Sequence, residues 1–138
     1  MSDSVFAAGA YPAEPTLTST ASAPLLDAER LDVYRVALEF QVLAARLVPR
    51  KGQSVLRDQL DRASVSIVLN VAEGAGRFSG PDKARFYAMA RGSAAECAAV
   101  VDLLFARGLV TAALQRRARG LLVRIVQMLT KLTARVSE

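Results

Sequence analysis

The sequence predicts an all-α protein, an antiparallel up-down-up-down bundle of four helices. Ala, Leu and Arg dominate the chain, whereas it holds five Phe, three Tyr and no Trp, a composition that favours helix over strand. Four segments repeat apolar residues at steps of three and four, and short turns with Gly or Pro separate them. The length of 138 residues fits a single domain with a substantial core.

The first 26 residues differ in composition from the rest of the chain. They hold three of the five prolines and a Ser/Thr cluster, and their apolar residues follow no sustained period. Such a composition predicts a flexible tail, which makes residues 27–138 the bundle domain.

The first two helices are expected over residues 31–48 and 53–75, separated by the sequence PRKG at residues 49–52. The predicted core-facing seam of the first helix contains Leu31, Tyr34, Leu38, Val42, Ala45 and Val48. The seam of the second helix contains Leu56, Leu60, Ala63, Ile67, Asn70 and Gly74. Asn70 is thus a polar residue within a heptad-like seam.

The third helix is expected over residues 81–107, with a seam of Phe86, Ala90, Ser93, Cys97, Val100 and Leu104. Before it, Gly74 and Gly76 would allow left-handed backbone at the end of the second helix. Ser79 then resembles an N-cap, Pro81 a first-turn proline and Asp82 a capping acid, so a tight turn is expected here. Gly108 is expected to end the helix.

The fourth helix is expected over residues 111–136 and carries two apolar stripes. Its seam contains Leu114, Ala118, Leu121, Ile125, Met128 and Leu132, and a second stripe contains Leu122, Val126 and Leu129. The first helix also carries apolar residues on more than one face. Because a four-helix bundle needs only one face of each helix inside, the extra stripes predict a homo-oligomer.

The residue inventory argues against an enzyme. The chain has no His, which excludes His-dependent catalytic triads and the Glu-x-x-His diiron site. Glu73 and Glu96 could form an acid and base pair, but no nucleophile or metal-ligand cluster accompanies them. The sequence GAGRFSG is neither a Rossmann fingerprint nor a P-loop. We therefore expect no enzymatic activity, no metal and no cofactor.

The single cysteine, Cys97, lies among small apolar residues, so we expect a buried and unreactive thiol and no intrachain disulfide. The N-terminus lacks a basic segment followed by a long apolar one, and no run of about 18 uncharged apolar residues occurs. These features predict a soluble protein of the reducing cytoplasm without a membrane partner.

Polar residues interrupt the densest apolar part of the chain. Asn70, Glu73 and Arg77 are three and four residues apart and share one helix face, as do Ser93 and Glu96 on the next helix. Two interpretations stay open for this polar cluster: it fixes the register of the helices, or its surface also touches a ligand or partner. We expect the structural role, because buried polar groups that pair with one another specify register.

The segment QLDRASVSIVLNVAEGAGRFSGPDKARFYAMARGSAAE, residues 59–96, resembles the signature of a known family. These are the four-helix-bundle proteins encoded in intervening sequences of large-subunit ribosomal RNA, which include the accessory variability determinants of diversity-generating retroelements. The matching positions are Gln59, Ser66, Ile67, Asn70, Ala72, Glu73, Gly74, Phe86, Ala90, Gly92, Ser93 and Glu96. The resemblance implies a five-membered ring of bundles and no enzyme. For the retroelement members it also implies binding of nucleic acid and of a reverse transcriptase.

The fourth predicted helix carries six of the 18 basic residues and one acid, Glu138, at its end. Arg117, Arg124 and Lys131 are seven residues apart, which makes a row at intervals of roughly 10.5 Å. The row is flanked by Arg116, Arg119 and Arg135. The face is either solvated or contacts phosphates of RNA or DNA without reading bases. The sequence thus predicts a nucleic-acid-binding accessory protein or, as the alternative, a homo-oligomeric platform for a protein partner whose charge is incidental.

Overall fold

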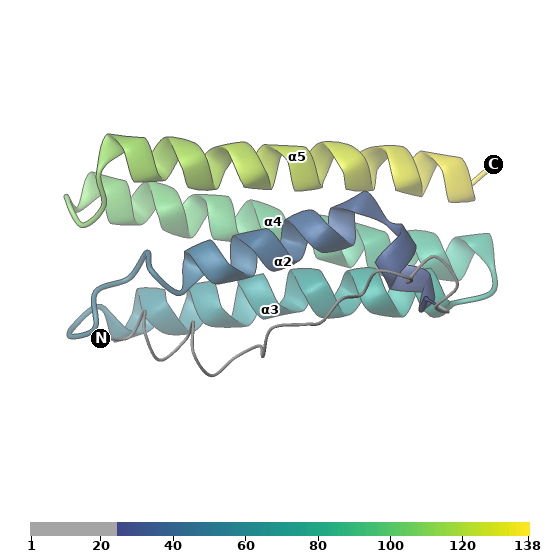
Figure 1. Ribbon diagram of the computed structural model, residues 1–138, viewed down its shortest axis with the longest axis horizontal. Coiled ribbons are helices and arrows are strands. Elements are labelled where there is room, and N and C mark those ends of the chain that lie inside the picture. The colour runs from purple at the N-terminus through teal and green to yellow at the C-terminus, as the bar shows by residue number, and fades with distance from the viewer. Residues whose placement is uncertain (1–24) are drawn as a thin grey trace, which may run out of the picture.

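The computed structural model describes residues 25–138, which form a short 3-10 helix and four α-helices. The elements are η2 (Asp27–Arg30), α2 (Asp32–Ala44), α3 (Ser54–Gly76), α4 (Gly80–Ala106) and α5 (Ala112–Val136). The α-helices lie side by side and alternate in direction (Figure 1). The predicted all-α, up-down four-helix bundle is therefore confirmed. Most of the predicted tail, residues 1–24, lies outside the described residues.

The helices pack in a closed square, in which α3 contacts α4, α4 contacts α5, and α2 contacts both α3 and α5. The α2–α3 loop and the α4–α5 turn lie at one end of the bundle, which we call the loop end (Figure 1). The α3–α4 turn and the C-terminus lie at the other end, which we call the turn end. Within residues 25–138, no helix is long and apolar enough to cross a membrane.

The core runs along the bundle axis and receives side chains from all four α-helices, among them Phe40, Ile67, Leu104 and Ile125, none of which is exposed. The predicted seams of α3, α4 and α5 face this core except at Phe86, which is half-buried, whereas its neighbour Tyr87 is buried in the core. Their buried members are Leu56, Leu60, Ala63, Ile67, Gly74, Ala90, Cys97, Val100, Leu104, Ala118, Leu121 and Ile125. Cys97 is fully buried, as expected.

The predicted seam of the first helix is wrong at Leu38, Val42 and Ala45, which are exposed, whereas Leu31, Tyr34 and Val48 pack partly buried against the core. Leu38 is 42% exposed and Val42 is 48% exposed. The core instead receives Val33, Val36, Ala37, Phe40, Leu43 and Ala44 from this helix. The helix has two apolar stripes of similar strength, and packing against α3 and α5 buries the one that holds Phe40. The α-helix also ends at Ala44 rather than at residue 48. The chain then tightens into turns in which the backbone N–H groups of Arg46 and Leu47 donate to carbonyls three residues back, at 2.9 Å and 3.1 Å.

The second apolar stripe of α5 lies inside the bundle. Leu122 is 1% exposed and Leu129 is fully buried. Since α5 packs against both α2 and α4, a wide face of the helix is buried, and this face includes both apolar stripes. The expectation that this stripe needs a partner molecule is therefore wrong for α5. On α2, the exposed Leu38 and Val42 still form an apolar surface that a partner molecule would cover.

The predicted α3–α4 turn is partly confirmed. The Ser79 side chain accepts a hydrogen bond from the Asp82 backbone N–H at 3.1 Å, as an N-cap does. Gly74 is helical, however, and in residues 25–138 only Gly52, Gln53 and Gly108 have positive φ. A Cβ atom at Gly74 would lie 2.8 Å from Tyr87 Cε1, so this glycine permits close contact between α3 and α4 rather than a left-handed turn.

The polar α3–α4 seam and the basic helix α5

A relay of hydrogen bonds connects α3 to α4 at the middle of the bundle. Asn70 Nδ2 donates to the Ser66 backbone carbonyl at 3.0 Å and to Ser66 Oγ at 2.9 Å. Ser66 Oγ lies 2.8 Å from Ser93 Oγ. Because Ser66 Oγ accepts from Asn70, its own proton is available for Ser93. The relay brings Asn70 and Ser93 together through Ser66, which sequence reasoning did not place in the polar cluster.

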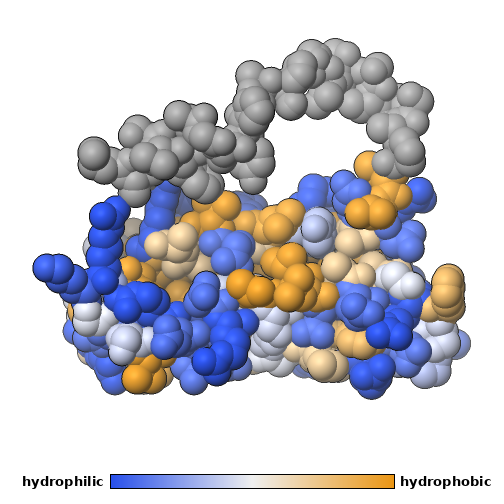
Figure 2. Space-filling view, turned by 90° about the horizontal axis from the view of Figure 1, so that it is seen from below, coloured by the Kyte–Doolittle hydropathy of each residue, from blue (hydrophilic) through white to orange (hydrophobic). Residues whose placement is uncertain are grey.

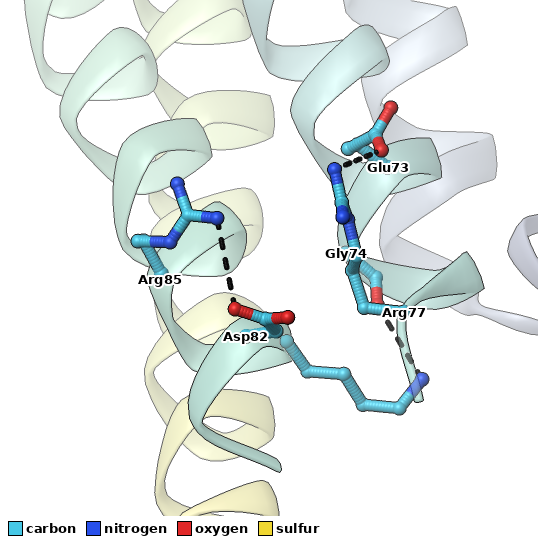
Figure 3. A network of polar contacts seen from close by, with 6 residues as sticks. Glu73, Gly74, Arg77, Asp82 and Arg85 are labelled. Carbon is cyan, nitrogen blue, oxygen red and sulfur yellow. Dashed lines mark hydrogen bonds and ion pairs between the residues drawn. The ribbon is translucent and has the colours of Figure 1, made fainter. Parts of the chain in front are cut away.

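Glu73 and Arg77 form a separate group at the end of α3. Arg77 Nη2 lies 2.7 Å from Glu73 Oε2, and both side chains are about half exposed. The Arg77 guanidinium also stacks 4.7 Å from the centre of the Phe86 ring, whose distance to the Arg85 guanidinium is 4.4 Å. Figure 3 shows the two ion pairs of this region, Glu73 with Arg77 on α3 and Asp82 with Arg85 on α4. Each ion pair lies on one side of the turn, whereas the stacking of Arg77 on Phe86 crosses from the end of α3 to α4.

Lys83 of α4 bonds to the end of α3, a contact that the sequence pattern did not predict. Its Nζ donates to the backbone carbonyl of Ala75 at 2.8 Å and is 3.4 Å from that of Gly74. The last carbonyl groups of a helix have no hydrogen-bond partner within the helix. The Lys83 ammonium group donates to two such carbonyls of α3, and its positive charge interacts favourably with the negative end of the α3 dipole. A lysine in the first turn after a tight helix–helix connection was the available signal.

Glu96 stands apart from both groups. It is exposed, and it makes no hydrogen bond or ion pair with another residue of 25–138. Burial, and to a smaller extent the Glu96 carboxylate, raises the pKa of the Cys97 thiol to about 12. The structure therefore divides the predicted polar cluster into a hydrogen-bond relay, an ion pair and a separate carboxylate. Glu73 is held by Arg77, so the two glutamates do not form a pair.

The bases of α5 lie on two different sides of the helix. Lys131 and Arg135 line a groove of about 250 Å³ between α5 and the start of α2, next to Arg30 and Asp32. Arg117 and Arg124 precede Lys131 at seven-residue steps and share its stripe. Arg119 lies on the other side, in a groove between α4 and α5.

All six basic residues of α5 are exposed: Arg116, Arg117, Arg119, Arg124, Lys131 and Arg135. None of them makes an ion pair or hydrogen bond with another side chain among residues 25–138. Arg117, Arg124 and Lys131 therefore form a row of unneutralised bases on the α2 side of α5, and Arg119 does not extend this row. The same part of the chain holds no group of three or more His, Cys, Asp and Glu residues that could bind a metal ion.

The fold and these features define a small antiparallel helical bundle with a polar α3–α4 seam and one basic helix. The family model of the 23S rRNA-intervening sequence protein matches residues 29–131, which cover α2, α3, α4 and most of α5. The chain belongs to the 23S rRNA-intervening sequence protein family. A comparison with curated proteins finds no match.

Proposed function

We propose that the protein is a non-enzymatic accessory protein that binds RNA or DNA through the basic stripe of α5. The observation that carries this proposal is that Arg117, Arg124 and Lys131 are exposed, lie on one helix stripe and are unpaired among residues 25–138. Unpaired arginines and lysines at regular intervals suit phosphate contacts, which are insensitive to base sequence. Binding is therefore weakly sequence-specific.

The protein acts as a homo-oligomer, a pentamer. Four exposed apolar side chains on α2 and α3 support self-association: Leu38, Val42, Val65 and Leu69. Figure 2 shows hydrophobic side chains gathered toward the middle of the face that α3 forms. The family resemblance of residues 59–96 supports five as the number of copies. Five chains of net charge +5 carry a formal charge of +25, which strengthens attraction to a polyanion.

A reverse transcriptase is the proposed protein partner. Support comes from the resemblance of the signature to the accessory variability determinants of diversity-generating retroelements. A reverse transcriptase gene and a template repeat beside the gene for this protein would support the partnership, and their absence would contradict it without affecting nucleic-acid binding.

Fluorescence anisotropy tests the nucleic-acid proposal. Labelled single-stranded RNA and duplex DNA are titrated with the wild-type protein and with the Arg117→Gln, Arg124→Gln, Lys131→Gln variant at several salt concentrations. We expect the wild-type affinity to fall by about 0.7 to 0.9 log units per log unit of salt for each phosphate contacted, and the variant to show a flatter slope. Exposed charges contribute little to folding, so the variant should melt like the wild type.

A second candidate function is a structural platform for a protein partner. The observation in its favour is Phe78, a fully exposed aromatic side chain at the α3–α4 turn, together with the 62% exposed Leu69. Large exposed apolar side chains are common at protein–protein contacts. If the wild type binds neither RNA nor DNA at low salt, α5 is a solvated face and the platform function replaces the first proposal.

A further inference from the structure

The two ends of the bundle differ sharply in charge. The loop end, residues 45–58 and 102–119, holds two acids, Asp58 and Asp102, and eight bases, a difference of +6. The bases are Arg46, Arg50, Lys51, Arg57, Arg107, Arg116, Arg117 and Arg119. The turn end, residues 25–35, 73–85 and 131–138, holds seven bases and six acids, a difference of +1. The excess positive charge of the described chain is therefore concentrated at one end.

The charges of the turn end also neutralise one another locally. Three ion pairs lie there, Asp32 with Arg35, Glu73 with Arg77 and Asp82 with Arg85. At the loop end, Arg57 and Arg107 bond to neutral partners instead. Arg107 Nη1 donates to Gln53 Oε1 at 2.7 Å. Because these contacts cancel no charge, Arg57 and Arg107 keep their full contribution to the positive charge of the loop end.

Hydrogen bonds from the Arg57 side chain hold the α2–α3 loop in place. Arg57 Nη2 donates to the backbone carbonyls of Pro49 at 2.6 Å, Arg50 at 3.1 Å and Gly52 at 2.6 Å. Gly52, with φ of +76°, and Gln53, with φ of +54°, allow the chain to reverse into α3. Since Gln53 is also bonded to Arg107, the loop is tied to the end of α4.

Two bases of this loop are left for an external ligand. Arg50 and Lys51 are exposed, and their side chains bond to no other residue of 25–138. The loop that carries them is held in place by Arg57, so binding a ligand would require little further ordering of backbone. Arg116 and Arg117 lie at the same end, on the first turns of α5, and are exposed as well. Figure 2 shows hydrophilic side chains dominating this end, at the left.

We propose that the loop end is a phosphate-contacting surface for RNA or DNA, in which Arg50 and Lys51 of the braced α2–α3 loop act together with the start of α5. This inference rests on the proposed function and adds a second contact to the α5 stripe. In a cyclic oligomer, equivalent ends of all copies lie on one circle around the symmetry axis. The loop ends then form a basic rim that can follow a nucleic-acid backbone without reading its bases.

A charge-matched pair of variants tests the inference. The double variant Arg50→Gln, Lys51→Gln removes two charges from the loop end. The control, Arg35→Gln with Arg85→Gln, removes two charges from the turn end, where both arginines are in exposed ion pairs. Binding of labelled single-stranded RNA and duplex DNA is measured by anisotropy across salt concentrations, and thermal melting monitors folding.

We expect the loop variant to weaken binding and to lower the slope of log K against log salt by about 1.4 for RNA and about 1.8 for duplex DNA, two lost phosphate contacts in each case. The control should change the slope little. Equal effects of the two variants, or no effect of the loop variant beside a weakened α5 triple variant, would overturn the loop-end surface and leave the proposed function intact. Absence of wild-type binding would remove both.

Discussion

Ser66 on α3 and Ser93 on α4 join the two helices through hydroxyl oxygens 2.8 Å apart. The pair lies beside Asn70, whose amide donates to Ser66, and near Gly74, against which Tyr87 packs. Small and polar side chains thus line the most extensive helix–helix contact of the bundle. Hydrogen bonds between half-buried groups tolerate little sliding of one helix along the other, so this seam specifies the register of α3 against α4.

Replacement of Asn70 by Leu tests the register role. The change removes two hydrogen bonds, each contributing about 0.5 to 1.5 kcal/mol, and adds apolar area at a half-buried position. We expect a melting temperature equal to or above that of the wild type, together with a broader distribution of oligomers in light scattering. A variant that keeps its fold and oligomeric state but loses nucleic-acid binding would show that the seam is a binding site.

Gly74→Ala should destabilise the protein by about 1 to 3 kcal/mol, the usual range for overpacking. The new methyl group would lie 2.8 Å and 2.9 Å from ring atoms of Tyr87 and 3.1 Å from Phe86 Cβ. Gly120→Ala is the matched control, since no atom lies within 4 Å of a Cβ atom there. In a helix interior that change should stabilise by roughly 0.5 to 1 kcal/mol. Urea unfolding of both variants decides the point, and equal effects would refute the close α3–α4 contact.

Stability should decline in alkaline solution. Burial raises the folded-state pKa of Cys97 to about 12 and raises that of Tyr87 as well. The unfolded chain releases the thiol proton from about pH 8.5, whereas the folded chain keeps it, so the unfolding free energy falls as pH rises from there toward 12. The thiol contributes a slope of up to about 1.4 kcal/mol per pH unit. Urea unfolding at pH 7, 8.5 and 10 measures it.

Cys97→Ala serves as the control for the alkaline effect. The variant should lose the thiol's share of the slope and retain the share of Tyr87. In the wild type, iodoacetamide should alkylate Cys97 at pH 8 only after denaturation, because the side chain is fully buried and protonated. Rapid alkylation of the native protein would show that the core around Cys97 opens readily.

The oligomer has a direct test in light scattering behind a sizing column at micromolar protein. We expect a mass of five chains of 14.7 kDa each. Leu38→Glu combined with Leu69→Glu should shift the mass toward one chain while circular dichroism still shows a helical protein, because both side chains face solvent within one bundle. A wild-type mass near 14.7 kDa would contradict self-association.

Several features could be predicted from the sequence because they depend on near neighbours in the chain. Helices α3, α4 and α5 begin and end within about one residue of the predicted positions, since turn chemistry such as the Ser79 cap and the positive φ of Gly108 is local. Their core seams follow from spacing alone, because a period near 3.6 places every third or fourth residue on one face. The sequence predicted two members of the hydrogen-bond relay, Asn70 and Ser93, but not Ser66, which joins them.

Only the tertiary structure decided how each helix is rotated about its own axis. Both α2 and α5 carry two apolar stripes, but only one stripe of α2 is buried, whereas both stripes of α5 are. Contacts with neighbouring helices determine that Phe40 and Leu129 are buried and that Leu38 is exposed. The same packing places Lys131 beside α2 and Arg119 beside α4. It also gathers bases from two distant loops at one end. Periodicity fixes angles within a helix, whereas the orientation of that helix is set by the side-chain packing of all four.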